Sequence, residues 1–202
     1  MASSVAICNQ ALVKVGAERI TSLLDDDENA KVLNAIYEIK RDAELAAHPW
    51  TFAIKRASIP ASSTAPAFGW AYSYPLPADY LALVEVGEDF TFYDSPTGAL
   101  FALESDPATG GMAILTDQPT PLDIRYIYKV TNPGLYPAPF VESFACRLAA
   151  EIVERRTQSL PKRQQAWDEY RMAIRTARRM NAIEQPAKQV PASSWVRALD
   201  EG

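Results

Sequence analysis

RDAELAAHPWTFAIKRASI, residues 41–59, is the segment on which the predicted fold depends, because a helical pattern ends there and an alternating one begins. Apolar residues leading into this segment recur at steps of three and four, which places them on one face of a helix. They are Val32, Ile36, Ile39, Ala43 and Ala46. Pro49 ends the helix, since proline lacks the N–H of the next helical bond and its ring keeps His48 out of the α region. Beyond it, Phe52 and Ile54 lie on one side of a predicted first strand.

The two sides of this junction differ in pattern. The chain is helical before it, carries short strands through its middle, and then returns to helix, which predicts an α+β fold. We expect an antiparallel helical bundle built from both chain ends, with an inserted small antiparallel β barrel or sandwich. The expected parts are residues 1–50 and 136–184 for the bundle, 51–135 for the β domain, and 185–202 for an extended C-terminal docking tail.

The middle of the chain has the composition of short strands. Pro75 and Pro77 remove two donors from a strand ladder, so this piece is expected to be an edge or an extended arm. Further segments are rich in β-branched and aromatic residues and are bounded by Gly, Pro or Asp. They are residues 81–88, 90–96, 99–106, 111–117 and 121–130. Together they predict five or six short antiparallel strands.

Short-range signals mark the ends of the first two helices. Ser3 or Ser4 is expected to cap the first helix, and Gly16 to end it. Asp25 followed by Glu28 has the form of a capping box for the second helix. A metal loop is the other interpretation of the neighbouring aspartates, although the glycine and the spaced oxygen ligands of a calcium loop are missing.

Two more helices are predicted after residue 136. The first starts near residues 137–140, and its broad apolar stripe favours a central position in the bundle. The second follows Leu160 and Pro161, and its outer side carries arginines at helical spacing, for which acidic groups of a partner, or phosphates, are the expected counterpart. Its predicted inner face consists of Trp167, Tyr170, Ile174 and Ala177. The arginines are Arg171, Arg175, Arg178 and Arg179.

Residues 185–202 lack a helical pattern but end in an apolar cluster. Prolines and small polar residues precede Trp195, Val196 and Leu199. Because a disordered tail does not usually need a tryptophan, we expect the tail either to fold back on its own bundle or to dock in a groove of another chain.

Composition places the chain among soluble globular proteins, with 48% hydrophobic and 22% charged residues. No apolar run approaches the roughly 20 residues needed to cross a membrane, and the first residues lack a signal-peptide pattern. We therefore expect synthesis in a reducing cytoplasm. Cys8 and Cys146 have apolar neighbours in helical patterns and are predicted to be buried free thiols. No cofactor is predicted, and two cysteines with one histidine do not favour a zinc site.

Charge is unevenly distributed along the chain. Nine aspartates and glutamates, and no lysine or arginine, lie between residues 57 and 124. Binding of phosphates needs lysine and arginine, so this segment is not expected to bind nucleic acid. Two interpretations remain open. An acidic face repels DNA that must slide past it, or it keeps a β domain soluble and apart from its copies.

The sequence contains no phosphate-binding glycine loop, no serine nucleophile motif and no zinc-binding motif. His48 is the single histidine, and it stands at the proline that ends a helix. It is expected to cap that helix or to pack against Trp50 rather than to act in catalysis. The protein is therefore not predicted to be an enzyme. An enzyme acting on cell-wall or nucleic-acid polymers is the weakest alternative, which an activity screen with a His48→Ala control would test.

Three segments resemble the tail tubular protein A family, the head-to-tail adaptors of short-tailed bacteriophages. They are RDAELAAHPWTFAIKR, PAFGWAYSYPLPADYL and IRYIYKVTNPGLYPAPFVESFACRLAAEIVE. The family's H-P-W helix end is matched by His48, Pro49 and Trp50, and its F-G-W loop is matched by Phe68, Gly69 and Trp70. These two motifs in this order form a fairly specific combination. Thr51 stands where the family usually has asparagine, which is expected to alter a local hydrogen bond.

The resemblance implies a homo-oligomeric ring, commonly a dodecamer, that lies between the portal protein and the tail nozzle protein. It places the protein in the virion tail, with double-stranded DNA passing through the lumen without sequence-specific binding and with no membrane partner. The arginine stripe and the tail with Trp195 are expected to contact the portal or adjacent subunits. Part of the acidic segment is expected to line the channel. The candidates are Glu85, Glu88, Asp89 and Asp94.

A nucleic-acid-binding protein that uses the basic fourth helix is the alternative function. Several phosphate contacts would make its affinity for duplex DNA fall steeply as salt rises, whereas an adaptor that lets DNA slide past would not show this dependence.

Overall fold

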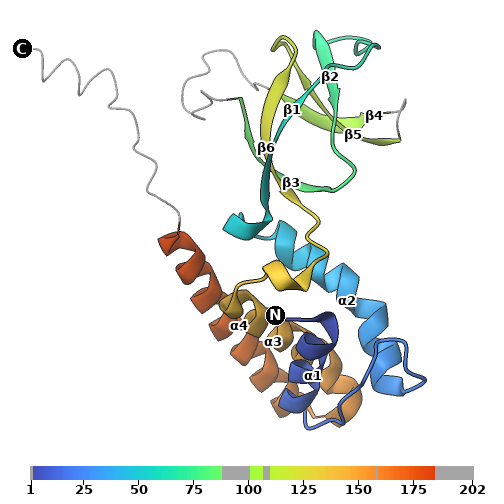
Figure 1. The fold of residues 1–202 in the computed structure, drawn as a ribbon, viewed down its shortest axis with the longest axis vertical. Coiled ribbons are helices and arrows are strands. Elements are labelled where there is room, and N and C mark those ends of the chain that lie inside the picture. Colours follow the sequence, from blue (N-terminus) through green and yellow to red (C-terminus); the bar gives the residue numbers. More distant parts are fainter. Residues whose placement is uncertain (1, 88–100, 107–109, 158, 185–202) are drawn as a thin grey trace, which may run out of the picture.

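The fold is known from a computed structural model, which describes residues 2–87, 101–106, 110–157 and 159–184 (Figure 1). Helices and strands both occur, so the predicted α+β class is confirmed. The helices are α1 (Ser4–Lys14), α2 (Glu28–Ala46), α3 (Ala138–Thr157) and α4 (Leu160–Ile183), with short 3-10 turns at Thr51–Ala53 and Pro133–Leu135. The strands are β1 (Ile54–Ile59), β2 (Tyr72–Pro75), β3 (Tyr80–Val86), β4 (Ala102–Asp106), β5 (Gly111–Thr116) and β6 (Leu122–Tyr128).

Helices from both ends of the described chain lie together, and the strands form the other end of the molecule (Figure 1). α3 packs against α1, α2 and α4, as its broad apolar stripe predicts. Phe140, Phe144 and Leu148 of α3 are almost completely buried in this helical core. Burying one such side chain instead of leaving it exposed stabilises the fold by roughly 1.5–3 kcal/mol. The apolar contacts of α3 therefore hold the other three helices in place.

The predicted buried face of α2 is only partly right, since Val32 and Ile36 are half-buried against the helical core but the other three residues are exposed. Ile39 is 68% exposed, and Ala43 and Ala46 are exposed as well. The residues of α2 that are buried are Asn29, Ala30, Leu33, Tyr37, Arg41, Glu44 and Leu45. Two residues on this face are charged. Arg41 pairs with Asp42, and Glu44 accepts a hydrogen bond from Tyr170. These contacts offset the cost of burying the two charges and allow a partly polar stripe to face the core.

The helix caps follow local chemistry, with one correction. Ser3 caps α1 by accepting a hydrogen bond of 3.1 Å from the N–H of Ala6, and Gly16 follows the helix with a φ of +69°. α2 is capped by Asp27 and not by Asp25. The Asp25 carboxylate instead accepts hydrogen bonds from the backbone N–H groups of Thr21 and Ser22, which keeps it in the preceding loop.

The strands form two antiparallel sheets of three strands each, in the orders β1-β6-β3 and β2-β5-β4. Both sheets contribute to a second core, in which Tyr74 and Ile114 of one sheet lie with Leu122, Ile124 and Tyr126 of the other. Among the described strands the two sheets stay separate, so the expected barrel is not formed there. The strand predicted at residues 90–96 lies outside the described residues.

The first sheet joins the β part to the helical part. Ile127 and Val130 belong to the helical core, and Leu81, Ala82 and Val84 of β3 pack against it. The sheet therefore continues the helical core at one end and closes the second core at the other. Within the described ranges, none of the helices combines the length and the apolarity that crossing a bilayer requires.

Candidate interaction surfaces

The H-P-W motif lies at the junction of α2 and β1, with Trp50 in the core, His48 half-buried and Pro49 exposed. Trp50 is 2% exposed, and its indole Nε1 donates a hydrogen bond of 2.9 Å to the carbonyl oxygen of Glu44. Its ring contacts the His48 ring at 4.7 Å and the Phe140 ring at 5.0 Å between centroids, both edge to face. His48 thus packs against Trp50, as predicted. The chain leaves α2 at this motif, and the contact between Trp50 and Phe140 fixes the turn against α3.

Asn181 of α4 ties the same junction to the C-terminal helix, and the sequence analysis missed it. Its side chain is buried, and its Oδ1 accepts hydrogen bonds from the backbone N–H of Thr51 at 2.8 Å and from the Thr51 hydroxyl at 3.0 Å. Its amide nitrogen donates to the carbonyl oxygen of Pro49 at 3.2 Å and lies 3.1 Å from Nε2 of His48. Thr51, the departure from the family motif, is thus one of its partners. The one available signal was its spacing of four residues from Ala177 on the inner face.

The geometry at Asn181 specifies the state of His48. Because Oδ1 of Asn181 accepts the Thr51 N–H, its amide N–H₂ faces His48, and a neutral imidazole Nε2 is the acceptor. Burial, followed by the positive charge of Arg178, lowers the pKa of His48. The histidine is therefore held neutral by its surroundings, in a structural position without a carboxylate partner among its described contacts.

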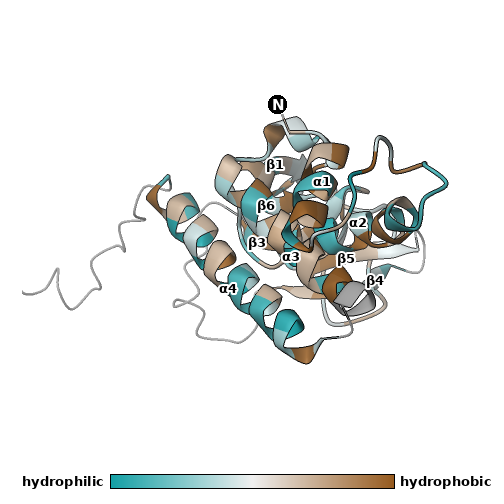
Figure 2. Ribbon diagram, turned by 90° about the horizontal axis from the view of Figure 1, so that it is seen from below, coloured by the Kyte–Doolittle hydropathy of each residue, from teal (hydrophilic) through white to brown (hydrophobic). Residues whose placement is uncertain are grey.

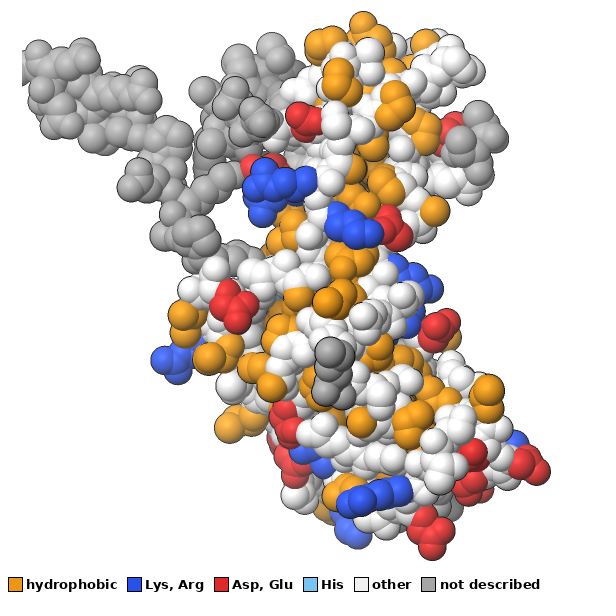
Figure 3. All heavy atoms as spheres, viewed as in Figure 1, with side chains coloured by type: hydrophobic (Ala, Val, Ile, Leu, Met, Phe, Trp, Pro, Cys, Tyr) orange, Lys and Arg blue, Asp and Glu red, His pale blue; other side chains and the backbone are white. Residues whose placement is uncertain are grey.

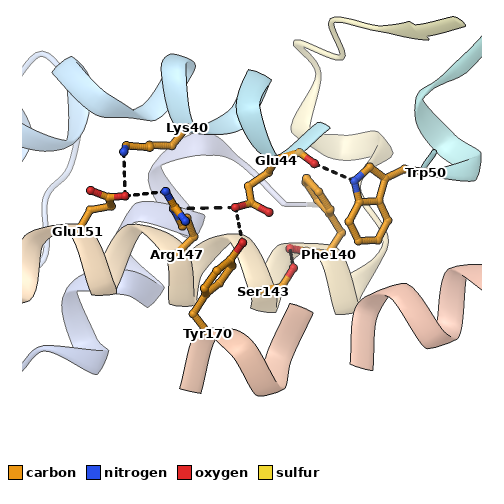
Figure 4. A network of polar contacts seen from close by, with 8 residues as sticks. All are labelled: Lys40, Glu44, Trp50, Phe140, Ser143, Arg147, Glu151 and Tyr170. Atoms are coloured by element: carbon orange, nitrogen blue, oxygen red, sulfur yellow. Dashed lines mark hydrogen bonds and ion pairs between the residues drawn. The ribbon is translucent and has the colours of Figure 1, made fainter. Parts of the chain in front are cut away.

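A polar network holds α2, α3 and α4 together (Figure 4). The hydroxyl of Tyr170 on α4 donates a hydrogen bond of 2.6 Å to the buried carboxylate of Glu44 on α2. Arg147 of α3 lies 3.9 Å from Glu44 and pairs at 2.8 Å with Glu151, which also pairs with Lys40 of α2 at 2.8 Å. Burial, and then the hydrogen bond to Glu44, raises the pKa of Tyr170 to about 12, so the phenol remains a donor at neutral pH.

The outer face of α4 is both basic and apolar. All four arginines of the predicted stripe are exposed, and Arg171 pairs with Asp168 at 2.8 Å. Met172 is 67% exposed and Ile183 is 69% exposed on the same helix. Figure 2 shows hydrophilic and hydrophobic residues interleaved along α4. The sequence analysis identified the arginines but missed the apolar residues between them.

The F-G-W motif lies apart from H-P-W, in the loop between β1 and β2. Phe68 is 89% exposed, Gly69 has a φ of +86°, and Trp70 is half-buried. The positive φ of Gly69 is a conformation that residues with a Cβ rarely adopt. The H-P-W motif thus precedes β1 and buries its tryptophan in the core, whereas the F-G-W motif lies in the loop after β1 and exposes its phenylalanine.

The acidic candidates for a channel lining are only partly described. Glu85 of β3 pairs with Arg125 of β6 at 2.6 Å, and its side chain is 14% exposed. This pairing neutralises its charge within the sheet, so Glu85 contributes little to an acidic surface. Glu88, Asp89 and Asp94 lie outside the described residues, as do Trp195, Val196 and Leu199 of the predicted tail.

An open groove of about 890 Å³ lies between α1, α3 and α4. Its polar lining includes Lys14 and Glu142, which form an ion pair of 2.6 Å, and Asp168 and Glu169 of α4. No group of three or more potential metal-binding side chains exists in the part of the chain that the structure describes. Cys8 and Cys146 are free and buried, as predicted, and burial raises the pKa of Cys8 to about 12. These thiols are therefore poor nucleophiles.

Comparison with known proteins finds neither a family model that matches this sequence nor a matching curated protein. The likeness to the tail tubular protein A family therefore depends on the motif residues themselves.

Proposed function

We propose that this protein is a structural head-to-tail adaptor of a short-tailed bacteriophage, and not an enzyme. In this proposal, copies of the chain form a ring, a dodecamer by analogy with the family, between the portal protein and the tail nozzle protein of the virion. Double-stranded DNA passes through the lumen of the ring without sequence-specific binding. The protein is made in the host cytoplasm and has no membrane partner.

The observation that carries the proposal is the outer face of α4. Of the 24 residues of α4, only Ile174, Ala177 and Asn181 are buried. Methionine and arginine are enriched in protein interfaces, and Met172 is exposed among the four arginines. α4 is anchored to the bundle by its buried residues and presents arginines and a methionine to solvent. Such a helix is suited to contact another protein.

The motif residues support the same proposal. Trp50 and Asn181 build a junction between the helical part and the first sheet, whereas the exposed Phe68 lies in the loop between β1 and β2. A rigid part with two separate surfaces can contact one partner at each end. The predicted tail, with Trp195, Val196 and Leu199 as its apolar anchors, is proposed to add a contact with the portal or with an adjacent subunit.

The test is the mass of the full chain in solution with and without portal rings, followed by imaging of the complex. We expect a ring to form on the portal, and removal of residues 186–202 to weaken portal binding. If the chain does not bind portal rings at any concentration, the adaptor proposal is wrong. If the shortened chain binds as tightly as the full chain, only the role of the tail is lost. Imaging also tests the channel lining, because acidic residues that all face outward would exclude it.

Nucleic-acid binding through α4 is the second candidate, and the exposed arginines favour it. Asp168 and Glu169 on the same helix oppose it, because they repel phosphates. A titration of duplex DNA at several salt concentrations separates the two functions. For the adaptor we expect weak binding, and for the alternative a steep loss of affinity as salt rises, of about 10³ or more between 50 and 200 mM for six phosphate contacts.

A further inference from the structure

The loop between α1 and α2 presents an exposed leucine in an acidic setting. Leu24, within residues 22–27, has a side chain that is 86% exposed. The loop is built to hold it there, because the Ser22 hydroxyl accepts a hydrogen bond of 3.1 Å from the Leu24 N–H and Asp25 accepts two from backbone N–H groups. Asp26 and Asp27 follow directly. We call residues 22–27 the Leu24 loop.

A matching surface lies along α4. Met172, Arg175, Arg179 and Ile183 follow one another at steps of three and four, so they share one face, opposite the buried Ile174 and Ala177. We call these four residues the α4 stripe. Its apolar members flank two cations, whereas the Leu24 loop places an apolar side chain next to carboxylates. The two surfaces are therefore complementary in both charge and polarity.

The two surfaces lie on opposite sides of the helical part. In Figures 1 and 2 the loop before α2 projects from one side and α4 forms the other. Figure 3 shows acidic side chains gathered at the edge where this loop lies. Surfaces on opposite sides of one molecule cannot both pair in a two-fold dimer, but they can link copies head to tail.

We propose that the Leu24 loop of one copy binds the α4 stripe of the next copy, so that this contact links neighbouring subunits. The inference rests on the proposed ring and names the contact within it. The open groove shares Met172 with the α4 stripe, but it is a poorer receptor for the acidic loop, because three carboxylates, those of Glu142, Asp168 and Glu169, line it beside the single cation of Lys14. Arg175 and Arg179 of the α4 stripe do not belong to the lining of this groove.

Disulfide cross-linking of the full chain tests the contact. A Leu24→Cys/Ile183→Cys double variant is expected to give a ladder of dimers, trimers and larger species under mild oxidation. Each single variant alone is expected to stay monomeric, and a mixture of the two singles to stop at dimers. Cys8 and Cys146 are 0% and 3% exposed and add little background. The matched control is Phe68→Cys/Ile183→Cys, because Phe68 is equally exposed but lies on the β part.

Charge reversal tests the electrostatic part. In the double-cysteine background, Arg175→Glu with Arg179→Glu is expected to lower the yield of ladder at least about tenfold, because like charges would then face each other. Adding Asp26→Lys is expected to restore part of the yield. Asp26 is suited to this change, since its ion pair with Lys31 lies at an exposed site.

Three results would overturn the contact. They are a ladder of equal yield from the Phe68→Cys control, dimers from Leu24→Cys alone at the yield of the double variant, and the absence of a ladder both in concentrated solution and on portal rings. Binding to portal rings without a ladder would refute this contact and leave the adaptor function standing. A ladder without portal binding would support the contact and refute the adaptor function.

Discussion

The backbone N–H of Thr51 donates a hydrogen bond of 2.8 Å to Oδ1 of Asn181, which lies 130 residues later in the chain. This bond joins the segment that leaves α2 to the last turns of α4. The same amide side chain also donates to the carbonyl oxygen of Pro49. One buried asparagine thus bonds to backbone groups on both sides of Trp50, and it aligns α4 with the junction.

Replacing Asn181 by alanine is expected to destabilise the protein by about 1–3 kcal/mol. The substitution removes the acceptor of the half-buried Thr51 N–H, and an unsatisfied group of this kind costs about 1–3 kcal/mol. Urea unfolding followed by circular dichroism measures the change. Thr176→Ala is the matched control on the exposed side of α4, and it should stay within about 0.5 kcal/mol of the unmodified protein. Equal effects of both variants would refute this role of Asn181.

Stability should depend on the ionisation of His48. Its pKa is lowered in the folded state by burial and by Arg178, so the unfolded chain binds the proton more readily. The contribution of neutral His48 to the stability of the fold is therefore fully present above pH 6.5, the ordinary pKa of histidine. It is lost as pH falls through the lower pKa of the folded state. The free energy of unfolding, measured by urea titration between pH 7.5 and pH 5, should decrease below pH 6.5, by up to about 1.4 kcal/mol per unit of pKa shift.

The control for this pH dependence is His48→Gln, which removes the single histidine of the chain. Its stability should be nearly constant over the same range, because carboxylates titrate mainly at lower pH. If His48→Gln loses as much stability below pH 6.5 as the unmodified protein does, groups other than His48 cause the pH dependence.

Tyr170→Phe is expected to destabilise the protein by about 1.5–3 kcal/mol. It deletes the donor of the 2.6 Å hydrogen bond to Glu44, a buried carboxylate, and bonds to charged groups contribute about this much. Thermal and urea unfolding measure the loss. The control is Tyr72→Phe on β2, whose side chain is 36% exposed. A loss of less than about 0.5 kcal/mol for Tyr170→Phe would show that Arg147 alone satisfies Glu44.

Truncation of the two aromatic motif residues Trp50 and Phe68 should change stability by very different amounts. Trp50→Ala is expected to cost about 3–5 kcal/mol, because it leaves a cavity beside Phe140 and deletes the bond to the Glu44 carbonyl. Phe68→Ala should change stability by less than about 0.5 kcal/mol, since its ring is 89% exposed.

A binding measurement with portal and nozzle proteins completes this comparison. If Phe68 contacts a partner, its truncation weakens binding while the fold stays intact. If Phe68→Ala binds both partners as tightly as the unmodified chain, the F-G-W loop has no part in assembly.

Short-range chemistry alone accounts for several features of the fold. Pro49 ends α2 through its covalent geometry, Ser3 caps α1 through a bond to a residue three positions away, and Gly16 supplies a positive φ. The periodicity that begins near residues 137–140 also predicted a helix with a broad apolar stripe. These signals act within one turn or one side of an element, so one sequence is enough to find them.

The buried polar residues were beyond the reach of such signals. Glu44 and Asn181 look like ordinary solvent-facing residues until Tyr170 and Thr51, more than 100 positions away in sequence, come into contact with them. Glu44 is buried on the same side of α2 as Leu33, Tyr37 and Arg41, so the inner face of this helix lies away from Ile39. Spacing in sequence reports which residues can share a face, but the free energy of burying a charge depends on partners that other elements supply.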